Sequence, residues 1–162
     1  MKYRIANPKD INEILTMKNE VKKRIVEENL PIWLDGYPFD EMIIEDIEKG
    51  YGRILEEDGE IVGYACFHPA EVEYPPHTFK KENLQSFGRV MVKDGYVGKH
   101  YGSFLVKSMI EEAKAMGVEG LGILADACNT KAVRLYKKYG FQKEGSEQFP
   151  YAYLDIYGLY FE

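Results

Sequence analysis

Residues 88–103 read GRVMVKDGYVGKHYGS, and this stretch decides the fold. It begins with a short, mostly apolar run that predicts a strand, and Asp94-Gly95 predicts a turn. Gly98 and Gly102 then lead into residues 104–113, whose apolar positions have helical spacing. A helix begins with unpaired N–H groups and the positive end of its dipole, and glycines allow close backbone approach. The stretch therefore predicts an anion site, which we interpret as a diphosphate site.

The composition predicts one globular domain. The chain has 162 residues, of which 45% are apolar and 30% charged, and no repeat or linker is visible, so we expect a single domain over residues 1–162. The net charge of −6 argues against general nucleic-acid binding, because that needs a basic face. It is compatible with a cationic substrate.

The two cysteines, Cys66 and Cys128, lie far apart and in no metal-binding spacing. We therefore expect no metal site and no disulfide. The first residues do not resemble a signal peptide, and no apolar run reaches the ~20 residues of a membrane span. These features predict a cytoplasmic protein with no membrane partner.

Local patterns predict a mixed α/β domain with the order β-α-α-β-β-β-α-β-α-β-β. Antiparallel hairpins are expected first and a parallel unit around the opening stretch. Residues 68–81 are polar and rich in proline, so we expect a loop there. The expected strands cover residues 2–6, 51–55, 61–67, 84–92, 120–125 and 151–161, and a penultimate strand is expected to begin at residues 141–144. The expected helices cover residues 8–29, 40–49, 103–116 and 129–139.

Two separate motifs carry a resemblance to a known family. Residues 129–141, NTKAVRLYKKYGF, closely follow the pattern Asn-x-x-Ala-x-x-Leu-Tyr-x-x-x-Gly-Phe. Residues 97–102, VGKHYG, follow the looser pattern Gln/Arg-x-x-Gly-x-Gly/Ala. With this element order, the chain resembles the GNAT superfamily of acyl-CoA-dependent N-acyltransferases over essentially its whole length.

The loop motif departs from the family pattern at two positions. Val97 replaces Gln or Arg but keeps the backbone N–H that contacts a phosphate. His100 replaces the central glycine, and histidine tolerates a positive φ better than most residues. Lys99 offers a compact positive charge to the diphosphate of acyl-CoA.

The resemblance implies roles for residues around the donor. The Val90 N–H would polarise the acyl carbonyl, and Val92 would pair with the pantetheine arm. Tyr136 matches the general acid, and Asn129 would bond the pantetheine amides. The structural alternatives are a buried strand, a core tyrosine and a helix N-cap. The implied donor-binding residues are Val90, Val92, Val97, Gly98, Lys99, His100, Tyr101, Gly102, Ser103, Asn129 and Tyr136.

Several residues are candidates for the general base that would accept the proton of the amine. Some family members place a glutamate where this chain has Ser86, which is a poor base. The alternatives are His68, Glu71, Glu73 and His77, all in or beside the expected loop, or a chain of water molecules to bulk solvent.

The acceptor site is expected between the first two helices and near the last strands. Trp33, Tyr37 and Tyr151 are the candidate substrate-binding residues, with Tyr153 close to the last of them. Aromatic rings with an acidic neighbour suit a ligand that carries an amine. The alternative for Trp33 and Tyr37 is that they close the core beneath the loop.

The resemblance thus predicts an N-acetyltransferase that moves an acetyl group from acetyl-CoA to a small amine by direct attack in a ternary complex. A non-catalytic acyl-CoA-binding module and a protein or peptide N-terminal acetyltransferase are the alternatives. A dinucleotide-binding domain is poorly supported, because its glycine motif follows the first strand of the fold. A homodimer is compatible with the resemblance, although no sequence feature marks an interface.

Overall fold

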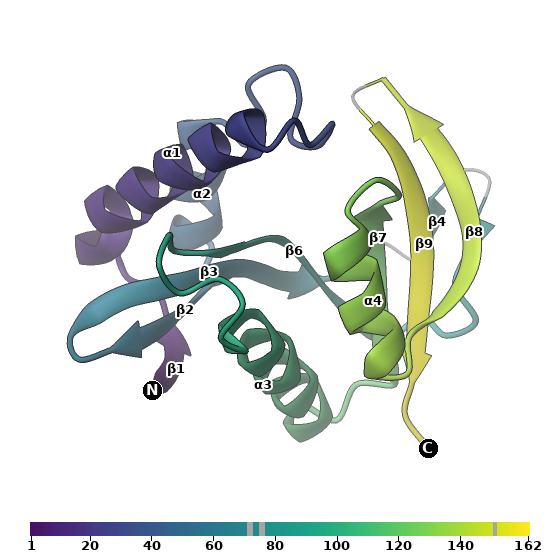
Figure 1. Cartoon of the computed structure of the whole chain (residues 1–162). Helices are drawn as coiled ribbons and strands as arrows, with labels where there is room; N and C mark the ends of the chain where they lie inside the picture. Colours follow the sequence, from purple (N-terminus) through teal and green to yellow (C-terminus); the bar gives the residue numbers. More distant parts are fainter. Residues whose placement is uncertain (71–72, 75–76, 151) are drawn as a thin grey trace.

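The fold is a mixed α/β domain built on a seven-stranded sheet of order β1-β2-β3-β6-β7-β9-β8 (Figure 1). The computed structural model describes residues 1–70, 73–74, 77–150 and 152–162. The main strands are β1 Lys2–Ile5, β2 Gly52–Glu57, β3 Glu60–Pro69, β6 Leu84–Val92, β7 Gly120–Asp126, β8 Gln142–Phe149 and β9 Ala152–Tyr160. The helices are the 3₁₀ turn Pro8–Asp10, α1 Ile11–Glu27, α2 Asp40–Glu48, α3 Tyr101–Ala115 and α4 Thr130–Lys138.

The sheet consists of two antiparallel halves joined by one parallel contact. β1, β2, β3 and β6 form the first half, and β7, β9 and β8 form the second. The parallel contact between β6 and β7 is limited to Leu84 opposite Gly120 and Gln85 opposite Leu121. The predicted fold class and its parallel unit are therefore confirmed.

The helices cover both faces of this sheet (Figure 1). α1 and α2 pack on one face, where Ile14, Ile43 and Tyr64 belong to one buried cluster. α3 and α4 pack on the other face, where Leu105 and Tyr136 share a second cluster with Phe87. The sheet thus separates a face covered by α1 and α2 from a face covered by α3 and α4.

One prediction, the loop over residues 68–81, is wrong. Residues 68–81 are not wholly a loop, because β3 continues to Pro69 and a short hairpin follows, β4 Glu73–Tyr74 with β5 His77–Thr78. β8, which is expected to begin at residues 141–144, runs from Gln142 to Phe149. As an edge strand it has only one neighbour, β9, so its polar residues give no alternating apolar signal.

Neither cysteine is in a disulfide: Cys66 is buried and Cys128 exposed. Over the described residues, no helix is long and apolar enough to cross a membrane. In the same part of the chain, no group of His, Cys, Asp and Glu is arranged to hold a metal ion.

Candidate active site

The site forms where β6 and β7 part. Beyond Gln85 the two strands are no longer paired, and they diverge across the middle of the sheet (Figure 1). The N–H of Lys93 donates to the Val62 carbonyl on β3. Because backbone groups alternate along a strand, the N–H and C=O of Val92 face the opposite side, toward the gap. This edge offers an extended ligand the hydrogen bonds of an added strand.

A β-bulge interrupts β6 beside the gap. Tyr64 pairs with Met91 and Cys66 with Gly88, so Arg89 and Val90 together oppose Ala65. Arg89 has φ 49°, a left-handed conformation that is costly for a residue with a side chain. A bulge redirects the backbone locally. Here it redirects Val90, which lines the cavity described below.

The Arg89 side chain ties this bulge to α2. Its guanidinium donates two hydrogen bonds to the Asp46 carboxylate, at 2.8 and 2.7 Å. It also donates to the Tyr37 hydroxyl at 3.2 Å, and Tyr64 donates to Asp46 at 2.9 Å. Burial lowers the pKa of Arg89, but the hydrogen bonds and charge of Asp46 outweigh it and raise that pKa overall. The ion pair thus links the donor strand, α2 and the loop that carries Tyr37.

The loop after β6 leads into α3 through a left-handed residue. His100 has φ 69° and stands at the N-cap, consistent with the expected tolerance of histidine for a positive φ. Within the described residues its side chain makes no capping hydrogen bond. The first N–H groups of α3, at Tyr101, Gly102 and Ser103, have no partner within the helix and can face an anion.

The side chains of this loop are engaged elsewhere. The Tyr101 hydroxyl donates to Glu57, and Ser103 Oγ lies 2.6 Å from the Tyr139 hydroxyl. Val97 and Lys99 are exposed. The loop therefore offers mainly backbone N–H groups, with Lys99 as an exposed cation.

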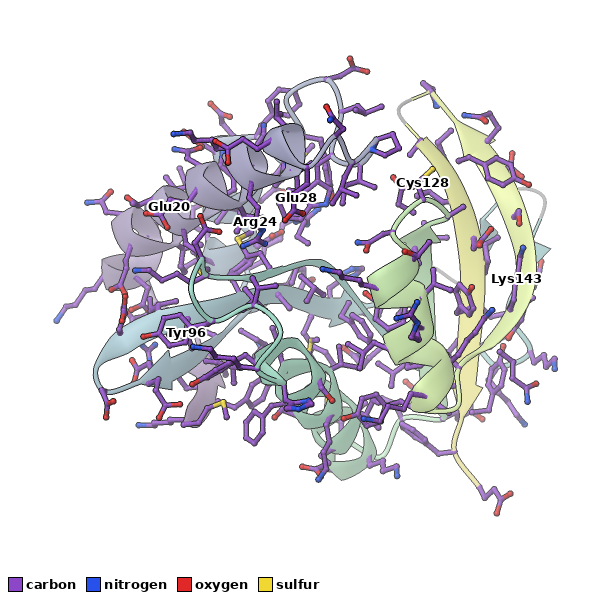
Figure 2. The ribbon with its side chains drawn as sticks, in the orientation of Figure 1. Glu20, Arg24, Glu28, Tyr96, Cys128 and Lys143 are labelled. Carbon is purple, nitrogen blue, oxygen red and sulfur yellow. The ribbon has the colours of Figure 1, made fainter. Side chains whose placement is uncertain are left out.

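Arg24 connects α1 to the far end of β6. Its guanidinium donates to the Val92 carbonyl at 3.3 Å and to the Asp94 carboxylate at 2.5 Å. Figure 2 shows Arg24 on the face of α1 that is turned toward β6. The Val92 carbonyl thus already accepts one hydrogen bond, from Arg24, whereas the Val92 N–H faces the gap between β6 and β7.

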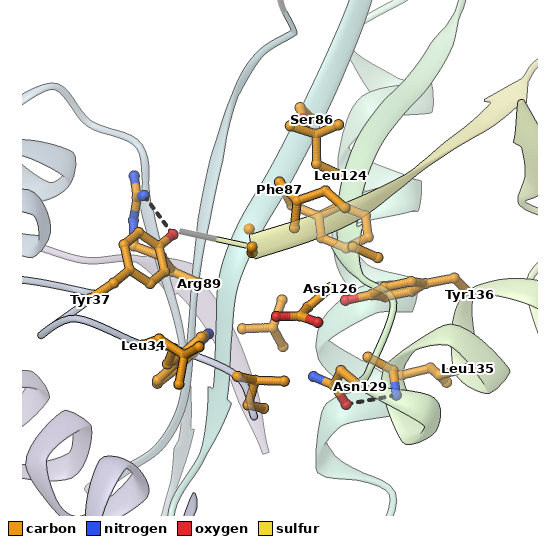
Figure 3. Close-up of a pocket in the computed structure, with 18 of the residues that line it drawn as sticks. Leu34, Tyr37, Ser86, Phe87, Arg89, Leu124, Asp126, Asn129, Leu135 and Tyr136 are labelled. Atoms are coloured by element: carbon orange, nitrogen blue, oxygen red, sulfur yellow. Dashed lines mark hydrogen bonds between the residues drawn. The ribbon is translucent and has the colours of Figure 1, made fainter. Parts of the chain in front are cut away.

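A cavity of about 490 Å³ opens beside the bulge (Figure 3). Its walls come from the loop between α1 and α2, from β3, β6 and β7, from α4 and from β9. The predicted site residues that line it are Trp33, Tyr37, Val90, Asn129 and Tyr136. Val92 and residues 97–103 lie outside this lining, further along β6 and at the start of α3. Tyr151 lies outside the described residues, although Ala152 and Leu154 line the cavity.

Tyr136 reaches the cavity from the helix motif shared with the family. Only 7% of the residue is exposed, and its ring packs edge-to-face on Phe87 and Phe141, with centroids 5.6 and 5.9 Å away. Burial raises the pKa of the Tyr136 hydroxyl, so it stays protonated at neutral pH. Figure 3 shows this hydroxyl pointing into the cavity.

Asn129 caps α4, since its Oδ1 accepts a hydrogen bond from the Ala132 N–H at 3.3 Å. Its Nδ2 is left for a ligand. Asp126, at the end of β7, also lines the cavity, and its carboxylate accepts the Cys128 N–H at 3.0 Å. The Asp126 side chain reaches this wall from the end of β7, and the Asn129 side chain reaches it from the turn that precedes α4 (Figure 3).

Trp33 and Tyr37 line the opposite wall, on the side of α1 and α2. Their rings meet edge-to-face with centroids 6.4 Å apart. Trp33 has φ 52° and Gly36 φ 82°, so the loop turns tightly and presents both rings to the cavity. The cavity therefore has an aromatic wall facing the wall that carries Tyr136.

Sequence reasoning missed three polar residues of this site: Arg89, Asp46 and Asp126. Arg89 stands within the opening stretch, and a charged residue inside an apolar strand was the available signal. Asp46 interrupts the apolar side of a helix, which is a signal for a buried ion pair. Asp126 ends a buried strand just before the Asn129 motif.

The left-handed backbone at His100 allows a direct test. We expect His100→Val to lower the free energy of unfolding by about 1–3 kcal/mol, because a β-branched residue is strained at a positive φ. Lys99→Val is the matched control, since the neighbouring Lys99 has no positive φ. Urea unfolding followed by circular dichroism measures both. Equal losses in the two variants would contradict the backbone explanation.

Transfer of an acyl group from a thioester needs a polarised carbonyl, an acid for the departing sulfur and room for the attacking group. The parted strand edge, the Tyr136 hydroxyl and the cavity lie close together and can supply these three things, so the arrangement is compatible with an acyltransferase class of site.

Comparison with known proteins agrees with this class. The family model described as "Acetyltransferase (GNAT) family" matches residues 19–141. The chain belongs to the GNAT acetyltransferase family, in which acetyl-CoA is the acyl donor. The resemblance inferred from the two motifs is thereby confirmed.

Individual relatives are distant. An amino-acid acetyltransferase of Shewanella oneidensis is 25% identical over 112 residues, which cover 69% of this chain but only 22% of that protein. A GNAT-family acetyltransferase from Streptococcus agalactiae has a TM-score of 0.82 at 23% identity, covering 99% of this chain and 95% of that one. A GNAT acetyltransferase from Brucella melitensis, solved in complex with acetyl-CoA, has a TM-score of 0.67 at 18% identity, with coverages of 99% and 88%. These structures support the fold.

Proposed function

We propose that the chain transfers an acetyl group from acetyl-CoA to the primary amine of a small molecule. The observation that carries the proposal is that Tyr136, the bulged strand at Val90 and the aromatic pair Trp33 and Tyr37 all line one cavity. A donor thioester and an acceptor amine can thus meet without a covalent enzyme intermediate.

The donor is held along β6 and at the start of α3. The pantetheine arm lies in the gap beyond Gln85 and takes hydrogen bonds from the edge that carries Val92. The diphosphate lies against the N–H groups that follow Gly98, with Lys99 adding positive charge. The Val90 N–H polarises the acyl carbonyl, and Asn129 Nδ2 donates to an amide carbonyl of the arm.

The acceptor occupies the other side of the cavity. The volume of about 490 Å³ lies within the range of small-molecule sites, about 300–1,000 Å³. Among the described lining residues the charged side chains are Arg89 and Asp126, and Arg89 is already paired with Asp46. The Asp126 carboxylate therefore gives the cavity a net negative charge, which attracts a protonated amine.

In the reaction the bound protonated amine first loses one proton to solvent. The neutral nitrogen then attacks the thioester carbonyl carbon, forms the C–N bond and gives up a second proton to a base or to solvent. The carbonyl then re-forms as the C–S bond breaks. Tyr136 donates its hydroxyl proton to the departing sulfur, and solvent returns a proton to Tyr136.

The test is thiol release from acetyl-CoA with a panel of free L-amino acids, spermidine, phenethylamine and a peptide with a free N-terminal alanine. We expect turnover with one or more of the small amines. Turnover confined to the peptide would contradict the small-molecule acceptor. Binding of acetyl-CoA by calorimetry with no turnover on any amine would instead favour a non-catalytic module.

The charge at Asp126 gives a further prediction. We expect Asp126→Asn to raise KM for a cationic amine about tenfold, with a smaller change in kcat. The carboxylate attracts the bound amine, so its loss weakens binding, and a tenfold change corresponds to about 1.4 kcal/mol of binding free energy. Glu41→Gln, which removes an exposed carboxylate from α2, is the control and should leave KM unchanged. A fall in kcat at constant KM would contradict a binding role for Asp126.

A further inference from the structure

His68 lines the cavity from β3, and its imidazole is a group that can accept a proton. His68 is the penultimate residue of β3, is half-buried and lines the cavity with Ser86. In the sheet register His68 stands directly opposite Ser86. Side chains of directly paired residues project from the same face of a sheet and lie about 5 Å apart at Cβ. The histidine thus stands beside the serine, on the neighbouring strand.

The orientation of the imidazole favours a basic Nε2. His68 Nδ1 lies 2.8 Å from the Pro69 carbonyl oxygen. A carbonyl oxygen can only accept, so Nδ1 carries the hydrogen of the neutral ring. The lone pair is therefore on Nε2, which is the state of a histidine that can take up a proton.

His68 and Tyr136 belong to opposite faces of the sheet. Along β3 alternate residues share a face, and Tyr64 and Cys66 contact the Asp46 and Arg89 pair beneath α2. His68 continues that row, on the side of α1 and α2, whereas Tyr136 comes from α4. A base on the acceptor side and an acid on the donor side flank the thioester carbonyl from two directions.

The other polar side chains of the described lining are less suited to this role, because phenols ordinarily keep their proton at neutral pH and an asparagine amide is not a base. Ser86 is a poor base, Arg89 is a cation paired with Asp46, and the Asp126 carboxylate accepts the Cys128 N–H. Carboxylates ordinarily titrate near ~4, whereas imidazole titrates near ~6.5, close to neutral pH.

We propose that His68 is the general base of the transfer reaction, acting through Nε2 on the amine directly or through one water molecule. The inference rests on the proposed function. The amine nitrogen uses its lone pair to form the C–N bond, and its proton passes to Nε2, which gives an imidazolium. The C–S bond breaks, the sulfur takes its proton from Tyr136, and the imidazolium returns its proton to solvent.

Two substitutions separate a catalytic role from a structural one. His68→Asn keeps a donor near the position of Nδ1, and His68→Gln places a non-titrating amide near Nε2. We expect both to lower kcat/KM about 100-fold near neutral pH. We also expect the loss to shrink toward alkaline pH, where hydroxide replaces the base. Tyr51→Phe keeps the ring whose centroid lies 6.1 Å from His68 and should match the unaltered chain.

The measurement is the pH profile of kcat/KM with acetyl-CoA and the amine of the panel that the unaltered chain acetylates fastest. The charged or titratable side chains that line the cavity with His68, among the described residues, are Tyr37, Arg89, Asp126 and Tyr136, and the Tyr51 ring contacts the His68 ring. Tyrosine, arginine and aspartate side chains do not ordinarily titrate between pH ~5 and ~8. The inflection lost in both variants is therefore assigned to His68.

Calorimetry with acetyl-CoA should give the same affinity for all four chains, which also shows that they are folded. Full activity in His68→Asn, or a variant profile parallel to that of the unaltered chain, would overturn the role of His68 while the proposed function stands. No acetyl transfer by the unaltered chain to any amine would overturn both.

Discussion

Replacing Tyr136 by phenylalanine is expected to lower kcat about 1,000-fold while acetyl-CoA binds as before. The substitution removes one hydroxyl and keeps the ring that packs on Phe87 and Phe141. Without the hydroxyl the sulfur departs as an unassisted thiolate, and general acid catalysis commonly contributes about 10²–10⁴-fold. The measurement is single-turnover acetyl transfer at saturating donor, beside calorimetry with acetyl-CoA.

A matched control is available in the same core. Tyr157 is 1% exposed and shares the buried cluster of Tyr136, but it lies on β9 and does not line the cavity. Tyr157→Phe should therefore leave kcat unchanged. Unchanged turnover in Tyr136→Phe would remove Tyr136 from its proposed role, whereas equal losses in both variants would point to packing.

The second large effect is expected from the buried ion pair between α2 and β6. Asp46→Ala should lower the free energy of unfolding by about 3 kcal/mol, because it leaves the Arg89 guanidinium without its partner and the Tyr64 hydroxyl without its acceptor. The Arg89 side chain is 21% exposed, so water reaches it partly and the loss falls at the low end for buried pairs. Urea unfolding followed by circular dichroism gives this value.

The neighbouring residue supplies the control. Glu45 forms an ion pair with Lys49 at 2.7 Å on the exposed side of α2, with side chains 60% and 54% exposed. Glu45→Ala should not measurably shift the unfolding midpoint, because solvent screens such pairs. If Asp46→Leu combined with Arg89→Met regains most of the stability, the loss came from an unpaired charge. A double variant as unstable as the sum of the single variants would contradict that cause.

The sequence predicted those parts of the fold that have a local cause. Strand β6 and the start of α4 follow from apolar alternation and from Asn129 as a cap, and both have the predicted position. The first residues of the polar segment 68–81 have a non-local cause. His68 and Pro69 extend β3 because they pair with Ser86 and Gln85 on β6. Such a pairing between distant strands leaves no signal in the segment itself.

The candidate site shows the same division. Tyr136 and Asn129 stand in a motif, so their place at the cavity could be expected. Arg89 and Asp46 are 43 residues apart, and the local sequence around either residue does not indicate that they form an ion pair. In the sequence, His68 is one of several polar residues in an expected loop. The pairing with Ser86 on β6 places it in the sheet and beside the cavity.

The limited contact between β6 and β7 has a consequence for the whole molecule. Two residue pairs join the halves of the sheet, and beyond them the strand edges in the middle of the fold lack each other as partners. In the proposed complex the donor arm lies in that gap, where it acts as a strand of the sheet as well as a reactant. Conformational stability and donor concentration are then thermodynamically linked, by about 2.7 kcal/mol when free donor is 100 times its Kd. With this binding mode, removal of acetyl-CoA should lower the conformational stability of the protein.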